Sequence, residues 1–496
     1  VCPRTSRKTG ELPISPEIFK SPLFGQKFTE LSQPRLDDPH VTWEAKDPFE
    51  RLELLTHFMR KAAKFARDAI SRIDPNSDFA SGNFLASASR AVWQNDSSLA
   101  SLLLRVHPGA CHTIFIDCDS NVRLVAPQAF AEEFRCHRLK VNSLSQNALC
   151  NESSPRSDPA NVSSPPAPPV RGKARLSHLQ LRAKLWFPKH ATFVVQSILF
   201  QGEKHSEIAM HNRVLGKAWA PTFAAKNIDN MRTEEFLQFH ATHLPWHRAL
   251  PLTKELYASV LHRLKDSTPG KDGVPFSGWK AIGEIGINTL HECGSDLCDG
   301  VKPPIWFNDS LTAFIHKKPV IDADVVITPD DMRVLSLRLC SNKIISSAVN
   351  ASIRPVIKHG ISPNQRGFVP GRRIIDNVVD VESAGVLHSL IAGPSDSFDN
   401  FLKGFGSVSI ILLLDFMAAF PSVAHDWIFA ALRASKAPPY LIKLVEGLYA
   451  NVRAFVRVPS GYECAFFILC GILQGCPLSG ALFAIAVNPL SVSYTH

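Results

Sequence analysis

No run of apolar residues in this chain is long and unbroken enough to span a membrane. The most apolar stretch, Cys464 to Leu490, is interrupted by Gln474, Pro477 and Ser479, whereas a spanning helix needs about 20 consecutive apolar residues. The first ten residues are polar and basic, so they do not resemble a secretory signal peptide. These absences predict an intracellular protein, nuclear or cytoplasmic, with no membrane partner.

Paired metal-binding cysteines are also missing. The 11 cysteines include no CxxC pair, which is the usual signature of a structural zinc site. Zinc held by Cys111, Cys118, Cys136 and His137 is the alternative that this spacing leaves open. The sequence therefore favours no resident zinc.

The composition itself is that of a folded, basic protein. Hydrophobic residues make up 45% and charged residues 20% of the 496 residues, which is typical of globular chains. This length accommodates two to four domains. The net charge of +9 favours a polyanionic partner without identifying one. The chain begins with Val1 in place of Met, and we interpret it as a fragment.

The N-terminal part gives mainly local signals. Residues 1–40 are rich in proline and polar residues, and we expect them to be poorly ordered. Apolar residues recur at helical spacing from Asp47 to Ile73, with Lys and Arg between them, which predicts a basic helix. Its cationic face is either solvated or in contact with nucleic acid. Alternation predicts two short strands, Thr113–Ile116 and Val122–Val125.

A boundary follows these strands. Residues 150–173 consist largely of Ser, Pro and Asn, a composition that cannot build a core, so this stretch predicts a linker. Residues 177–265 read as several helices.

Two segments near the C-terminus carry the chemistry. The first is VSIILLLD at 408–415, whose length and composition predict a buried strand. A carboxylate at the end of such a strand is costly unless something pairs with it. Asp415 is therefore either the cap of a following helix or a rigidly held metal ligand.

The second segment is GILQGCPLS at 471–479, which lies between a strand-like run and an apolar helix. Gly475 permits a tight turn or a close approach to a ligand, and Pro477 suits the first turn of a helix. The Gln474 amide offers both a donor and an acceptor, which suits the sugar or base of a nucleotide.

Together these segments resemble a known family. LLLDFMAAFPSV (412–423) followed by GILQGCPLSGALF (471–483) resembles the first palm motif and the QG motif of reverse transcriptases, with non-LTR (LINE-type) retrotransposons as the nearest kin. Four further blocks occur upstream in the order of the family: STPGKDGVPFSGWK (267–280), LTAFIHKK (311–318) with DDMRVLSL (330–337), SNKIISSAVNASIRPVI (341–357) and SPNQRGFVPGRRIIDNV (362–378).

The resemblance implies roles at the reacting centre. Asp415, with the carbonyl of Phe416 beside it, would hold two Mg²⁺ ions that activate the primer 3′-hydroxyl and steady the leaving pyrophosphate. Phe420 would lie under the incoming sugar and exclude a 2′-hydroxyl; the alternative is a core aromatic. Gln474 and Gly475 would line the nucleotide pocket.

The resemblance also implies contacts in the fingers. Lys317, or Lys318 if the register differs by one residue, would neutralise the triphosphate together with Arg333. The residues expected along the template are Gln365, Arg366, Gly367, Arg372 and Arg373. The partners implied are an RNA template, a DNA primer and deoxynucleoside triphosphates.

Two departures from the family stand out. Pro421 occupies a position that is usually Asp in LINE-type sequences, and the Ala-Asp-Asp motif of the family does not occur in the 496 residues. One aspartate cannot by itself hold two ions. We therefore expect this polypeptide to have no polymerase activity as given, and its palm sheet to keep an unpaired edge.

The predicted fold class is α+β, a right-hand polymerase with fingers and an incomplete palm built on an antiparallel sheet, after a mainly helical N-terminal region. The predicted parts are an N-terminal region (1–149), a disordered linker (150–176), a helical connector (177–261), fingers (262–402) and a C-terminally truncated palm (403–496). The predicted function is RNA-directed DNA synthesis. The alternative is a non-catalytic retroelement remnant that still binds nucleic acid.

Overall fold

The protein is described here by a computed structural model. It describes residues 14–36, 43, 46–73, 88, 92, 95, 97–106, 114–117, 121–125, 197–317, 326–392, 415–416, 418–458 and 461–493. The chain divides into two compact units, one of residues 1–66 with 195–496 and the other of residues 67–194. The possible zinc ligands Cys111, Cys118, Cys136 and His137, and the whole predicted linker, lie outside the described residues.

The first helices belong to the larger unit. A 3₁₀ turn, η1 (Pro16–Lys20), leads into α1 (Pro22–Leu36). The expectation of poor order was wrong for these residues, because Phe19, Phe24 and Phe28 are buried and Phe24 contacts the other two rings. Three aromatic rings supply enough apolar surface to order a segment whose overall composition is polar.

The predicted basic helix is confirmed as α2 (Pro48–Ile73). Asp47 begins it, since its carboxylate accepts hydrogen bonds from the amides of Phe49 (2.8 Å) and Glu50 (3.3 Å), as an N-cap does. Leu52, Leu55, Met59 and other apolar residues at helical spacing are buried.

The smaller unit contains α4 (Ser97–Val106) and a hairpin of β1 (Ile114–Ile116) and β2 (Val122–Leu124). The two strands pair antiparallel, which confirms the predicted pair to within a residue at each end. Among the described residues of this unit, Ala88, Ala100, Leu103, Ile114 and Val122 form a buried hydrophobic cluster.

Residues 197–263 contain the expected helices and one hairpin that was not expected. The helices are α7 (Ile208–Trp219), α8 (Asn230–His240), the 3₁₀ turn η4 (Trp246–Arg248) and α9 (Lys254–Arg263). The hairpin pairs β3 (Ile198–Phe200) with β4 (Glu203–His205). The residue pattern of this segment does not indicate these two strands.

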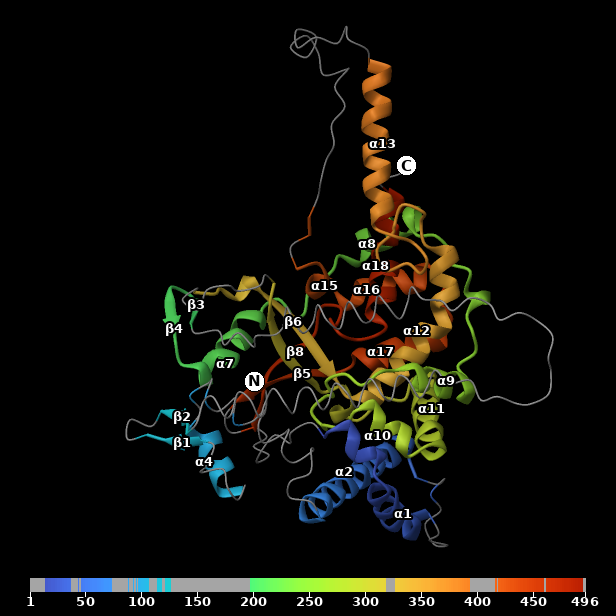
Figure 1. Ribbon diagram of the computed structural model, residues 1–496. Coiled ribbons are helices and arrows are strands. Elements are labelled where there is room, and N and C mark those ends of the chain that lie inside the picture. Colours follow the sequence, from blue (N-terminus) through green and yellow to red (C-terminus); the bar gives the residue numbers. More distant parts are fainter. Residues whose placement is uncertain are drawn as a thin grey trace, which may run out of the picture. The chain divides into compact units, whose positions relative to one another are not determined.

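A four-stranded sheet lies at the centre of the larger unit (Figure 1). Its strands, in spatial order, are β6 (Met332–Arg338), β5 (Ser310–His316), β7 (Val452–Val458) and β8 (Gly461–Ile468). Two pairs are antiparallel, but β5 and β7 run parallel. The sheet is therefore mixed, and the prediction of an antiparallel sheet was wrong for the β5–β7 pair.

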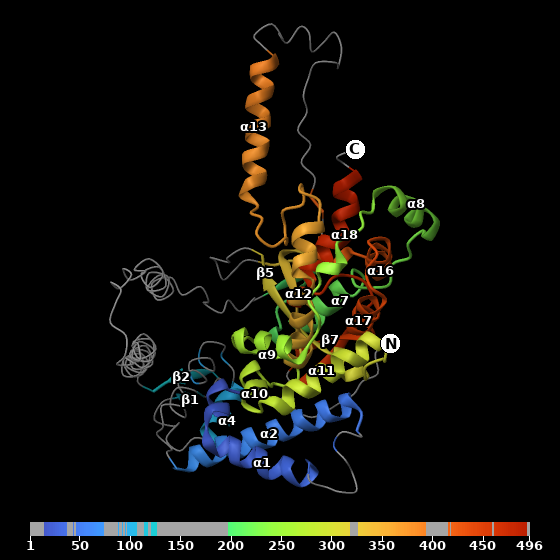
Figure 2. The same cartoon turned by 90° about the vertical axis from the view of Figure 1, so that its right-hand side faces the viewer.

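The larger unit contains further helices. They are α10 (Phe276–Ala281), α11 (Glu284–Asp299), α12 (Cys340–Gly360), α13 (Ile375–Ala392), α15 (Ala419–Ser422), α16 (His425–Ala434), α17 (Pro439–Tyr449) and α18 (Ser479–Ser493), with 3₁₀ turns η5 (Ile305–Asn308) and η6 (Pro329–Asp331). α7 packs on β7 and β8, and α12 packs against α9, α11 and α18 (Figure 2). None of the helices in the described ranges is both long and apolar enough to cross a membrane.

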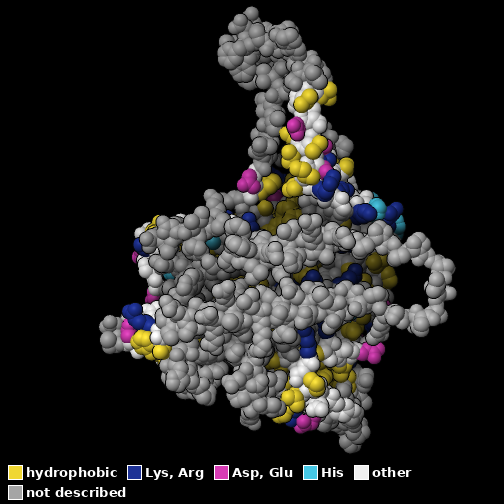
Figure 3. Space-filling view, viewed as in Figure 1, with side chains coloured by type: hydrophobic (Ala, Val, Ile, Leu, Met, Phe, Trp, Pro, Cys, Tyr) yellow, Lys and Arg dark blue, Asp and Glu magenta, His cyan; other side chains and the backbone are white. Residues whose placement is uncertain are grey.

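α13 exposes several apolar side chains to solvent. Ile375, Val378, Val379, Val386 and Leu387 are each more than half exposed. Figure 3 shows hydrophobic side chains in yellow on this part of the surface.

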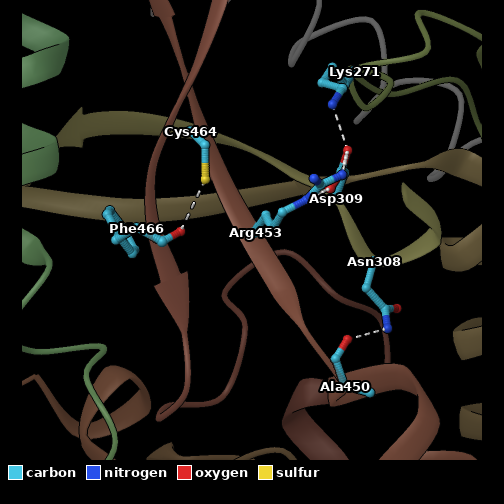
Figure 4. Close-up of polar contacts among 7 residues, drawn as sticks. All are labelled: Lys271, Asn308, Asp309, Ala450, Arg453, Cys464 and Phe466. Carbon is cyan, nitrogen blue, oxygen red and sulfur yellow. Dashed lines mark hydrogen bonds and ion pairs between the residues drawn. The ribbon is translucent and has the colours of Figure 1, made fainter. Parts of the chain in front are cut away.

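A buried ion cluster holds one end of the sheet. The Asp309 carboxylate, whose side chain is 2% exposed, accepts two hydrogen bonds from the Arg453 guanidinium (2.7 and 3.0 Å). It also accepts one from the Lys271 ammonium (2.5 Å), which lies 3.6 Å from the centre of the Phe455 ring. The cluster joins the loop before α10, the start of β5, and β7 (Figure 4).

Candidate active site

Asp415 and Phe416 are solvent-exposed residues outside regular structure, and Phe416 is 63% exposed. The predicted strand before them, residues 408–414, lies outside the described residues. Within the described ranges, no cation forms an ion pair with the Asp415 carboxylate. The carboxylate is thus accessible to a ligand, and none of the four strands of the sheet includes it.

The segment that follows Asp415 packs directly on the QG segment. The amide of Gly471 donates to the carbonyl of Val423 (2.7 Å), and the amide of Ile472 donates to the carbonyl of Phe420 (2.7 Å). Ala424 and Cys470 form an isolated antiparallel bridge beside them. Two segments separated by about 50 residues in sequence therefore share backbone hydrogen bonds.

Gly471 is required for this close approach. It has φ of +96°, and a Cβ atom there would lie 2.6 Å from the carbonyl oxygen of Pro421 and 2.8 Å from its Cα. His425 reinforces the contact through its Nε2, 3.0 Å from the carbonyl of Gly471. Burial lowers the pKa of His425, so the ring is neutral near pH 7 and donates from Nε2.

The Gln474–Gly475 bend lies against β6. The amide of Ser336 donates to the carbonyl of Gln474 (2.7 Å). Gly475 has φ of +107°, and a Cβ there would be 3.0 Å from the carbonyl oxygen of Ser336. Glycine is thus needed both for the left-handed turn and for the approach to the strand. The hydroxyl of Ser479 closes the turn by donating to the carbonyl of Leu473 (2.6 Å).

Arg333 lies on β6, and Lys317 directly follows the neighbouring strand β5, at the same end of the sheet. Arg333 is directly opposite Ile315 in the β5–β6 pair, and the amide of Lys317 donates to the carbonyl of Asp331 (2.8 Å). Side chains directly opposite one another share a face, and so do residues two apart along a strand. Both cationic side chains are exposed. Lys318 lies outside the described residues.

The loop between α12 and α13 carries the predicted template residues. The Arg372 guanidinium donates to the carbonyls of Ile361 (2.7 Å), Ser362 and Gln365 (2.7 Å), so it acts as an internal clamp. The Gln365 amide donates to the carbonyl of Gly367 (3.1 Å).

The other two arginines of this loop pair with carboxylates of α13. Arg366 forms an ion pair with Asp380, and Arg373 forms one with Asp376 (3.2 Å). Both carboxylates are at least one-third exposed, so these pairs contribute little to stability and a nucleic-acid phosphate could compete for either arginine.

Phe420 belongs to a cluster of three aromatic rings. Its ring centre is 4.5 Å from that of Phe483 on α18 and 5.3 Å from that of Phe368 in the α12–α13 loop. Sequence reasoning missed Phe368 and Phe483. Phe483 falls within the QG block, but no local pattern reveals that the two rings meet Phe420.

The donors present suit Mg²⁺ in part. The Asp415 carboxylate and the Phe416 carbonyl are hard oxygen ligands of the type this ion prefers, and Mg²⁺ usually keeps waters and phosphate oxygens for its other positions. Within the described ranges, no three His, Cys, Asp or Glu side chains are grouped closely enough to hold a metal by themselves.

Part of the chain is similar to known proteins. Residues 315–496 match the family model of reverse transcriptase (RNA-dependent DNA polymerase). The transposon TX1 uncharacterized 149 kDa protein of Xenopus laevis is 29% identical over 240 residues, which cover 48% of this chain. The retrovirus-related Pol polyprotein from type-1 retrotransposable element R2 of Bradysia coprophila is 37% identical over 76 residues, 15% of this chain. This chain carries a reverse-transcriptase domain of a non-LTR retrotransposon protein.

The matched parts cover only 17% and 9% of the lengths of these two relatives. The reverse-transcriptase match contains all of the predicted site residues, from Lys317 to Gly475. It begins within β5, so Lys271 and Asp309 of the buried ion cluster lie outside it, and Arg453 lies inside it.

Proposed function

We propose that this reverse-transcriptase domain is part of an enzyme that copies RNA by two-metal nucleotidyl transfer, with Asp415 as one of the catalytic carboxylates. One observation carries the proposal. The segment after Asp415, the Gln474–Gly475 bend and strand β6 are joined by backbone hydrogen bonds of 2.7 Å, from Gly471 and Ile472 on one side and from Ser336 on the other. Three blocks that are distant in sequence therefore converge where an incoming nucleotide would lie.

In this proposal residues 262–402 are the fingers and residues 403–496 belong to the palm. Asp415 and the Phe416 carbonyl would hold Mg²⁺, which supplies charge neutralisation at the reacting phosphate when bound. Lys317 and Arg333 bind the triphosphate as cations. Gln474 and Gly475 line the pocket, and Phe420 lies beneath the sugar.

The template side of the site is the α12–α13 loop. Arg366 and Arg373 exchange their exposed carboxylate partners for backbone phosphates of the RNA. Arg372 holds the loop in shape, while Gln365 and Gly367 lie along the template. The cationic contacts make binding salt-dependent, since each neutralised phosphate releases a counterion.

A polypeptide of these 496 residues is expected to show no primer extension on an RNA template with Mg²⁺. Asp415 is the one palm carboxylate that the proposal can assign, and a two-metal site needs further carboxylates to hold both ions. The measurement is extension of a labelled DNA primer by the purified chain. An extension product that disappears in Asp415→Ala would overturn this expectation.

Nucleotide selection can be measured without catalysis. The probe is an RNA template annealed to a DNA primer that ends in a dideoxynucleotide, mixed with the chain, Mg²⁺ and either the complementary or a non-complementary dNTP. After a heparin challenge, native gels measure the protein–nucleic acid complex that persists. The complementary dNTP is expected to increase this complex, because it adds contacts to the triphosphate and the templating base.

Lys317→Ala and Arg333→Ala are each expected to raise the dNTP concentration needed by roughly ten- to a hundredfold, because a hydrogen bond to a charged group contributes about 1.5–3 kcal/mol. Arg433→Ala, at an exposed ion pair on α16, is the control and should change nothing. A complex that forms equally well with either dNTP contradicts the proposal and favours the non-catalytic nucleic-acid-binding remnant.

A further inference from the structure

Phe368 has a backbone conformation that is unusual for a bulky residue. Its φ is +61°, and its side chain is 59% exposed. An aromatic residue in the left-handed region persists only where the surrounding structure holds it, and such residues cluster at functional sites. Here the Arg372 clamp holds the loop, and the amide of Ser362 donates to the side-chain oxygen of Asn488 on α18 (2.8 Å).

This conformation places the Phe368 ring on Phe420. The ring centres are 5.3 Å apart, and Phe368 also meets Phe483 edge-on at 6.0 Å. Both separations lie within the range of favourable aromatic pairs. Phe420 therefore contacts one ring from the template loop and one from α18.

Gly480 supplies the room for this arrangement. A Cβ atom at Gly480 would lie 2.9 Å from Cδ1 and 3.3 Å from Cβ of Phe368. Contacts that short force the ring to move, so glycine at the start of α18 is what permits the ring to lie there. The positive φ of Phe368 and the absence of a side chain at Gly480 therefore both permit the contact between the Phe368 and Phe420 rings.

We propose that Phe368 is a positioning residue for Phe420, and that it thereby determines the preference for deoxyribonucleoside over ribonucleoside triphosphates. This inference rests on the proposed function, in which Phe420 lies beneath the sugar. With the Phe368 ring in place, Phe420 cannot turn toward the template loop. Without it, Phe420 gains room to turn aside, and a 2′-hydroxyl can be accommodated.

The test uses the full chain in the heparin-challenge assay with the dideoxy-terminated primer, comparing complementary dATP with ATP. We expect the wild-type chain to need at least about tenfold more ATP than dATP, as steric exclusion of a small group typically gives. Phe420→Ala should bring this ratio close to one. Phe368→Ala should lower it several-fold, mainly by improving the binding of ATP, while Phe368→Tyr keeps it.

Two further variants guard against a folding defect. Gly480→Ala should also lower the ratio, because it displaces the Phe368 ring while alanine favours the helix. Phe239→Ala, at an aromatic residue on α8 that is 74% exposed, should leave it unchanged. Circular dichroism checks that each variant is folded.

The outcomes separate the two proposals. If Phe420→Ala abolishes the preference while Phe368→Ala and Gly480→Ala keep the wild-type ratio, the positioning role is wrong and the proposed function stands. If neither dATP nor ATP stabilises the wild-type complex, or if Phe420→Ala keeps the preference, the proposed nucleotide site itself is wrong and the inference falls with it.

Discussion

Replacing Asp309 with asparagine is expected to lower the free energy of unfolding of this protein by about 3–5 kcal/mol, the usual cost of removing one partner from a buried ion pair. The substitution preserves size but removes the charge that compensates Arg453 and Lys271. The Arg453 side chain is 14% exposed, so its guanidinium cannot regain full hydration without disturbing β7. Urea unfolding followed by circular dichroism measures the change.

A matched substitution at an exposed carboxylate distinguishes the effect of burial from the effect of losing a negative charge. Glu446→Gln also converts a carboxylate to an amide, but Glu446 pairs with Arg433 at the surface, where the two side chains are 42% and 59% exposed. Its expected effect is less than about 1 kcal/mol. If Asp309→Asn and Glu446→Gln destabilise the chain equally, the buried cluster does not contribute as the contacts indicate.

A double variant tests the physical reason. Asp309→Leu with Arg453→Met removes both charges of the best-buried pair, and replacing such a pair with apolar residues is often close to neutral. Lys271 is 30% exposed and can turn to solvent. The double variant is therefore expected to be more stable than Asp309→Asn, although it carries more substitutions.

The elements that could be predicted from the sequence are those with a strong local signal. α2 has the spacing of a helix over 26 residues, and β1 and β2 alternate around a short turn. In both cases the pattern that buries apolar side chains lies within a single stretch of chain.

Other elements depend on distant partners, and no local pattern reveals them. β5 pairs in parallel with β7, about 140 residues further along the chain, and the Asp309–Arg453 contact follows from that pairing. The helix at Pro22–Leu36 has a polar composition and is ordered by three buried phenylalanines. The mean polarity of a segment does not show which of its side chains are buried, and here the buried side chains order the helix.

The same distinction holds for the candidate site. The identities of Asp415, Gln474 and Gly475 came from motifs, which record residue types in order along the chain. Motifs do not record which backbone groups touch. The hydrogen bonds from Gly471 and Ser336, the left-handed Phe368 and the use of Arg372 as a clamp within its own loop became visible only in three dimensions.

Among the contacts that join the Asp415 segment to the QG bend, we expect the one at Gly471 to be the most sensitive to substitution. Gly471→Ala is expected to lower the free energy of unfolding by roughly 2–5 kcal/mol, combining about 1–2 kcal/mol for alanine in the left-handed region with about 1–3 kcal/mol for overpacking. The added Cβ would meet backbone atoms of Pro421 at 2.6–2.9 Å, and backbone cannot rotate aside as a side chain can. Urea unfolding measures the loss.

Two other glycines allow the cost of the backbone conformation to be measured separately from the cost of the steric clash. Gly202 in the β3–β4 turn has φ of +82° but nothing within 4 Å of an added Cβ, so Gly202→Ala should cost only the conformational part, about 1–2 kcal/mol. Gly25 in α1 has open space and no positive φ, so Gly25→Ala should stabilise the helix by about 0.5–1 kcal/mol.

The stabilisation of the template–primer complex by dNTP should depend on the steric clash at residue 471 and not on backbone strain in the left-handed region. Gly471→Ala pushes the Phe420–Val423 segment away from the QG bend, so the complementary dNTP should no longer stabilise the template–primer complex. Gly202→Ala should keep that response. If Gly471→Ala retains the dNTP response, or costs no more stability than Gly202→Ala, then the contact between the Asp415 segment and the QG bend does not hold the site together.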